Sequence, residues 1–68
     1  MIEVIFLINE SEEGGYIAKC LTESIFTEGD DMATLKENIR EAVLTHFDED
    51  TLPKVVRLHF VKDEVLAI

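Results

Sequence analysis

Apolar and polar residues follow two different periods along the chain, and the change of period separates strands from one helix. Residues 1–9 are apolar on both alternations, which predicts a central strand that is covered on both faces. Gly14–Gly15 can supply the positive backbone φ of a hairpin turn. Residues 16–22 then alternate as a second strand, and residues 24–28 predict a short third strand antiparallel to it.

One amphipathic helix is predicted after the third strand. Asp31 is the best N-cap, because its carboxylate can accept hydrogen bonds from free backbone N–H groups and complements the positive end of the helix dipole. The helical pattern ends within residues 48–53, where the proline restricts the residue before it. Residues 54–68 favour either one long bent strand or two strands joined at Asp63. The apolar stripe of the helix consists of Met32, Leu35, Ile39, Ala42, Val43 and Phe47.

These elements predict an α+β fold in the order β-β-β-α-β. The sheet is expected to have three or four mainly antiparallel strands, with the helix packed on one face. A crossover through the helix would place the last strand beside the first. Residues 1–68 form a single domain, since no repeat or linker divides them. A chain this short buries only about 60% of its unfolded surface, so we expect oligomerisation to add stability.

The charge of the chain restricts its partners. Fifteen acidic and six basic residues give a formal net charge of −9. Direct nucleic-acid binding is disfavoured because phosphate contacts need clustered Lys and Arg, and an anionic membrane surface is disfavoured for the same reason. A basic protein would be attracted electrostatically. The alternative is that the acidity only keeps a small protein soluble, and charge alone does not distinguish the two.

Two further features predict a cytoplasmic protein. The single cysteine excludes an internal disulfide and fits a reducing compartment. Glu3 occupies the place of the basic region of a signal peptide, and the apolar run at residues 4–8 is too short to span a bilayer.

The sheet contains more apolar surface than one helix can cover. The first strand is apolar on both faces, and the chain finishes with an apolar segment at residues 65–68. Large exposed apolar patches are uncommon in soluble monomers, so we expect another protein or a second copy to cover part of this surface. The residues expected to bind a partner, on the second sheet face and the last strand, are Val55, Arg57, His59, Val61, Glu64, Val65, Leu66 and Ile68.

A carboxylate metal site of the nuclease type would have to use Glu3, Glu41 and Asp63. The centre of the first strand, where a key carboxylate would be needed, is wholly apolar. Glu41 falls on the polar side of the helix. We therefore interpret these carboxylates as solvated surface charge and expect no metal ligands.

The cysteine and the two histidines, which could serve in catalysis or metal binding, can each be explained by a structural role. Cys20 alternates with Ala18 and is expected to be a small core residue rather than a nucleophile. His46 lies in the last helical turn, where a positive charge suits the dipole. His59 could donate to a partner carboxylate or pack against its neighbours, and we favour packing. We expect no catalytic residue, no cofactor and no enzymatic activity.

The order of these motifs resembles the HicB-like antitoxin family. The resemblance is carried by Gly14–Gly15–Tyr16, by Thr27 with Gly29–Asp30, and by the helical run Glu37–Ala42. Residues 57–64 resemble the last segment of a compact branch of that family, which lacks a C-terminal DNA-binding domain. Residues 21–24 depart from the proline-containing connection common in the family.

The resemblance implies a truncated ribonuclease-H-like fold without nuclease activity. It also implies an antitoxin-like module that neutralises a small basic mRNA interferase of the HicA type by occluding its active face. The alternative is a self-associating domain, a homodimer or higher oligomer with a structural or small-ligand-binding role and no toxin partner. Strong salt dependence of binding would favour the first, and a salt-indifferent homo-oligomer the second.

Overall fold

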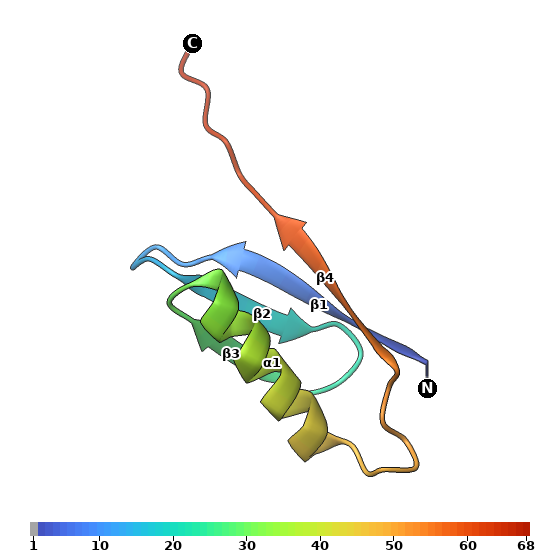
Figure 1. The fold of residues 1–68 in the computed structure, drawn as a ribbon. Coiled ribbons are helices and arrows are strands. Elements are labelled where there is room, and N and C mark those ends of the chain that lie inside the picture. Colours follow the sequence, from blue (N-terminus) through green and yellow to red (C-terminus); the bar gives the residue numbers. More distant parts are fainter. Residues whose placement is uncertain (1) are drawn as a thin grey trace.

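A computed structural model describes residues 2–68 and confirms the α+β class and the β-β-β-α-β order (Figure 1). Met1, the first residue of the first predicted strand, lies outside the described residues. The elements are β1 (Glu3–Glu10), β2 (Tyr16–Cys20), β3 (Phe26–Gly29), α1 (Met32–His46) and β4 (Val55–Val61).

The four strands form one mixed sheet in the order β3-β2-β1-β4. β1 pairs antiparallel with β2 and parallel with β4, and β2 pairs antiparallel with β3. The crossover through α1 therefore places the last strand beside the first, as predicted. β1 is the central strand to which both flanking strands attach.

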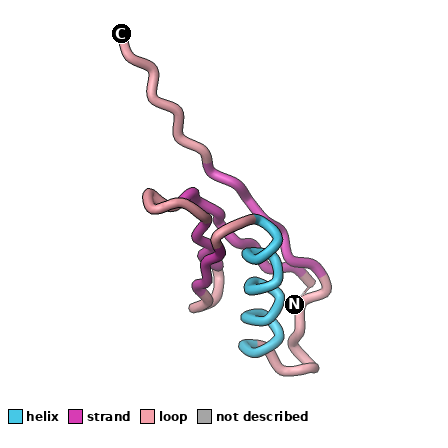
Figure 2. The backbone as a smooth tube through the Cα atoms, turned by 60° about the vertical axis from the view of Figure 1, so that its left-hand side comes forward, coloured by secondary structure: helices cyan, strands magenta, loops and turns pink. Residues whose placement is uncertain are grey.

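The helix covers one face of this sheet, as Figure 2 shows. Alternate residues of β1 face it because side chains of a strand point to opposite faces in turn. The apolar residues of α1, which recur every three to four positions, pack against these β1 side chains. The buried core consists of Val4, Phe6, Ile8, Ala18, Cys20, Ile25, Leu35, Ile39 and Val43.

The last part of the chain differs from both predicted alternatives. β4 ends at Val61, and residues 62–68 are an extended segment without secondary structure. The reason is the length of the neighbouring strand: Val61 pairs with Asn9, and β1 ends at Glu10, so the chain beyond has no strand to pair with. Figure 1 shows this segment, which we call the C-terminal extension, leading away from the sheet.

Gly29 is required because β3 and the first turn of α1 approach closely. A Cβ atom at this position would lie 2.6 Å from the backbone nitrogen of Leu35 and 2.7 Å from its Cα. Both distances are shorter than any normal carbon contact, so backbone would have to move. The glycine therefore determines how tightly the helix returns to the sheet.

Asp31 is the N-cap of α1, as predicted. Its Oδ1 accepts a hydrogen bond of 2.7 Å from the backbone N–H of Thr34. Hydrogen bonds from Thr34 to the carboxylate lower the pKa of Asp31 below its usual range. At the other end, the Phe47 N–H donates to the Val43 carbonyl.

Substituting Gly29 by alanine should destabilise the chain by about 1–3 kcal/mol, because the added Cβ overpacks the contact with Leu35. Denaturant unfolding measures the change. Glu28→Ala, at an exposed site on the same strand, should change stability by less than about 0.5 kcal/mol. Equal effects of the two substitutions would contradict the close approach.

Asp31→Ala should lower the melting temperature by about 4–8 °C at neutral pH, because the helix loses its cap. Asp30→Ala is the matched control with the same charge change. The pKa of Asp31 is lowered in the folded chain, so its charge stabilises above the unfolded pKa and this contribution is lost as pH falls through the folded pKa. The melting difference between wild type and Asp31→Asn should therefore disappear at acidic pH, and a pH-independent difference would contradict the assignment.

Candidate interaction surfaces

The sheet face opposite α1 is not covered by any other element of residues 2–68. We call it the open face. Register places Leu7 of β1 between Lys19 of β2 and His59 of β4, and places Ile5 beside Arg57. Ile5, Leu7 and Ile17 are only half-buried. The open face thus has these apolar residues as its centre, with both polar and apolar side chains around them.

The structure divides the predicted partner-binding residues into two groups. Those of β4 lie together on the open face, because they alternate with the helix-facing Val56 and Leu58. The others lie on the C-terminal extension, where Val65 is 94% and Leu66 is 86% exposed. The first group is Val55, Arg57, His59 and Val61, and the second is Glu64, Val65, Leu66 and Ile68.

Arg57 is held in place by a carboxylate on the neighbouring strand. Its Nε and one terminal nitrogen donate to the two oxygens of Glu3 at 2.8 and 3.2 Å. The hydrogen bond and the opposite charge raise the pKa of Arg57, and the same bond lowers the pKa of Glu3. The charge of Arg57 is therefore largely compensated within the chain, which leaves the apolar residues as the more available part of this face.

One end of the sheet is strongly acidic. The β1–β2 turn, the β3–α1 connection and the start of the extension meet there around two surface hollows. Lys62 is the single basic residue that lines them. The acidic residues of this end are Glu10, Glu12, Glu13, Glu28, Asp30 and Asp63.

The three carboxylates considered for a metal site are not brought together. Glu3 begins β1, whereas Asp63 follows the opposite end of the parallel strand β4. Glu41 is exposed on α1 and lines a different hollow. Among residues 2–68, no group of three His, Cys, Asp or Glu side chains is arranged to hold a metal ion.

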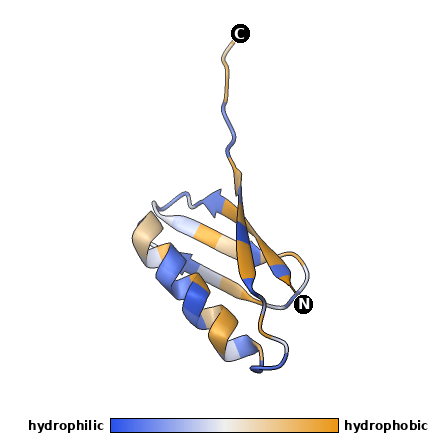
Figure 3. Cartoon of the chain, turned by 45° about the vertical axis from the view of Figure 1, so that its right-hand side comes forward, coloured by the Kyte–Doolittle hydropathy of each residue, from blue (hydrophilic) through white to orange (hydrophobic). Residues whose placement is uncertain are grey.

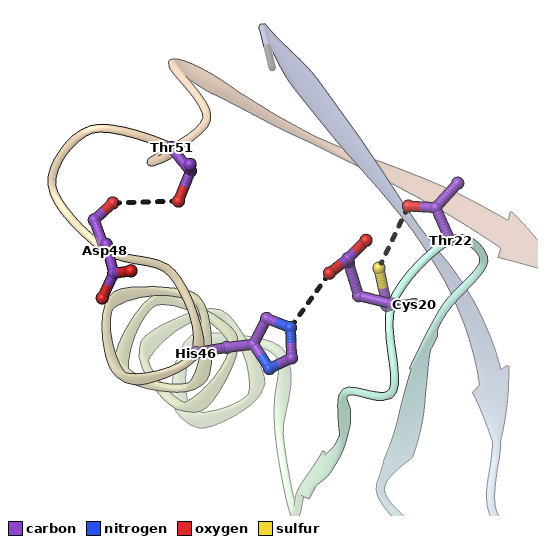
Figure 4. Close-up of polar contacts among 6 residues, drawn as sticks. Cys20, Thr22, His46, Asp48 and Thr51 are labelled. Atoms are coloured by element: carbon purple, nitrogen blue, oxygen red, sulfur yellow. Dashed lines mark hydrogen bonds and ion pairs between the residues drawn. The ribbon is translucent and has the colours of Figure 1, made fainter.

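Cys20 and His46 have the structural surroundings expected for them (Figure 4). Cys20 is 3% exposed in the core, with its Sγ 3.9 Å from the Thr22 hydroxyl. His46 lies at the end of α1, and its Nε2 is 3.0 Å from a carboxylate oxygen of Glu23. The contact joins the end of the helix to the β2–β3 connection, a partner that helical spacing alone could not reveal.

A second surface was not predicted from the sequence. A groove of about 420 Å³ lies between α1 and β4. Leu44 lines it and is 57% exposed. The sequence does contain one sign of this groove: Leu44 is apolar but lies outside the core-facing stripe of the helix.

Within the part of the chain that the structure describes, α1 is the one helix, and it is neither long nor apolar enough to cross a membrane.

Fold and surfaces define a small α+β domain with one helix-covered sheet face and one open face. The chain belongs to the UPF0150 family. It is 50% identical over 66 residues to a UPF0150 protein of Thermotoga maritima, an alignment that covers 97% of this chain and 93% of the relative. It is 44% identical over 52 residues to a UPF0150 protein of Archaeoglobus fulgidus, with 76% and 77% covered. No family model and no solved structure matches the chain.

Removing the Arg57 charge should raise the pKa of Glu3 towards its usual value. NMR titration of the Glu3 carboxyl carbon in Arg57→Gln measures this, with Lys19→Gln as the control for charge removal elsewhere on the open face. Because the folded pKa of Glu3 is lowered, the pair stabilises above the unfolded pKa and loses its effect as pH falls through the folded one. The melting temperatures of wild type and Arg57→Gln should therefore converge as pH falls through the lowered folded pKa of Glu3. An unchanged Glu3 titration in Arg57→Gln would refute the pairing.

Proposed function

We propose that the chain is a protein-binding module whose partner is a small basic protein, bound against the open face. The observation that carries this proposal is the apolar centre of that face. Ile5 and Leu7 share this face of β1, Ile17 lies diagonally from Leu7 on β2, and no element of the described chain packs on them. Burial of this centre by a partner would be favourable because apolar area is removed from water.

The charge of the chain supports a basic partner. The net charge is −9, and the acidic end of the sheet lies where β1 ends, so it adjoins the open face. Complementary charge accelerates encounter and disfavours acidic competitors. An apolar centre beside an acidic border therefore suits a partner with an apolar patch next to Lys and Arg.

The resemblance to HicB-like antitoxins makes a HicA-type mRNA interferase the candidate partner. The resemblance implies that such a toxin is small and that its surface is basic, as RNA binding requires. An acidic module that covers its active face would neutralise it by excluding the RNA. In this proposal the chain needs no catalytic residue, since occlusion alone inactivates the toxin.

The test is co-purification of the tagged chain with the small protein encoded by the adjacent reading frame. A complex is expected whose affinity falls steeply between about 50 mM and about 500 mM salt, since exposed charges are screened over this range. Production of the adjacent protein alone should arrest growth and degrade mRNA, and the chain should relieve both effects.

Leu7→Lys should weaken this complex at least tenfold, or by about 1.4 kcal/mol, because it places a positive charge in the apolar centre. Thr45→Lys carries the same added charge on the exposed side of α1 and should bind as wild type. His59→Lys, at an exposed site directly beside Leu7, provides a second test if Leu7→Lys does not fold. The proposal is wrong if no basic protein co-purifies, or if the substitutions on the open face bind as tightly as Thr45→Lys.

A further inference from the structure

The groove between α1 and β4 exists because the helix crosses the sheet to one side. The backbone of α1 comes within 8 Å, Cα to Cα, of β2 and β3 but not of β4. Val56 and Leu58 of β4 face the helix side across this gap and are only half-buried. Leu44 of α1 forms the opposite wall, and Leu52 and Pro53 line the groove near the start of β4. The result is an apolar groove open to solvent.

The charge of the groove is opposite to that of the chain. Lys36, Arg40 and Lys54 line it, which is half of the six basic residues in the sequence. Among the described residues, none of the fifteen acidic ones lines it. An occupant that fits this groove is therefore apolar and carries negative charge.

Residues 63–68 of the C-terminal extension, which follow its one basic residue Lys62, have this chemistry. Asp63 and Glu64 supply two negative charges, and an apolar run follows them in residues 65–68. Figure 3 shows the hydrophilic part next to the sheet and the hydrophobic part further out. The extension is fully exposed, so its apolar side chains are unburied in a single chain. Groove and extension are thus complementary in both polarity and charge.

The extension is directed away from the groove of its own chain. β4 passes the groove between Lys54 and Leu58 and continues in the same direction beyond Val61 (Figure 1). A return would require a reversal at residues 62–64, which contain no glycine, proline or asparagine and only one favoured turn residue, Asp63. A second copy placed antiparallel to the first avoids the reversal, because its extension then runs along the groove of the first.

We propose that residues 63–68 of one copy occupy the groove between α1 and β4 of a second copy, in a reciprocal two-fold dimer. Two-fold symmetry makes each chain both donor and acceptor, so the assembly closes at two copies. An extended six-residue segment spans about 20 Å, which is comparable to the length of one edge strand. The dimer uses the groove and leaves the open face free, so it forms with or without a basic partner protein.

Sedimentation equilibrium of the full chain tests the assembly. The expected mass is twice the 7.7 kDa of one chain. Leu66→Asp should raise the dissociation constant at least about tenfold, since it places a charge in the apolar groove. Leu21→Asp is the matched control, because Leu21 is also exposed but lies outside both the groove and the extension. A chain that stays monomeric up to about 1 mM, or a dimer that Leu66→Asp leaves intact, would overturn the proposal.

A charge exchange tests the groove itself. Arg40→Glu should weaken the dimer, and Arg40→Glu combined with Glu64→Arg should restore it, because the two side chains then exchange signs. Failure of the double substitution to restore the dimer would contradict this pairing of surfaces.

Cysteine cross-linking distinguishes exchange between copies from folding back within one chain. Leu44→Cys and Leu66→Cys chains, mixed and oxidised, should form a disulfide heterodimer, while Leu21→Cys mixed with Leu66→Cys should not. The native Cys20 is buried and does not compete. A Leu44→Cys/Leu66→Cys chain that oxidises to a cross-linked monomer would show that the extension occupies its own groove, and the dimer proposal would be wrong. Circular dichroism confirms that each exposed-site variant is folded.

Discussion

The structure depends on the burial of one face of β1 by α1. Val4, Phe6 and Ile8 point towards the helix and are at most 1% exposed, whereas Ile5 and Leu7 of the same strand point to the open face. A single helix can shield only one side of a sheet, and residues 2–68 supply no second covering layer. Both interaction surfaces of the chain follow from this incomplete coverage.

The position of the helix decides where the uncovered surface lies. Gly29 lets the first turn of α1 approach the sheet closely, and Asn38 donates to the Glu28 carbonyl on the outer strand β3 at 2.7 Å. These contacts hold the helix over β3 and β2. β4 is consequently left with one exposed flank, and the groove opens on that side. Six of the fifteen acidic residues gather at one end of the sheet, whereas Lys36 and Arg40 lie beside the groove.

Local patterns predicted most of the fold. The helix was predictable because Asp31 is followed by apolar residues at helical spacing, and both signals act within one element. The central place of β1 followed from its two apolar faces. The end of β4 was not predictable, because it is determined by where a distant strand stops. Likewise, Ile2 and Phe60 alternate correctly with core residues but are 72% and 53% exposed, since they lie beyond the part of the sheet that the helix covers.

The candidate surfaces were predicted only in part for the same reason. The four β4 residues share a face because alternation is a local rule, so their grouping could be foreseen. The separation of residues 64–68 from them depends on the loss of strand pairing after Val61. The groove depends on the angle and position of a helix relative to a strand, and no periodicity in the sequence carries that information.

The parallel pairing of β1 with β4 joins the two ends of the chain, with Glu3 opposite Val55. The strand that completes β1 therefore comes from the far part of the sequence. Until this pairing forms, one flank of the most apolar strand stays open, and an unpaired apolar strand is a template for aggregation. Closure of the β1–β4 pair is thus the folding event that removes this exposed edge.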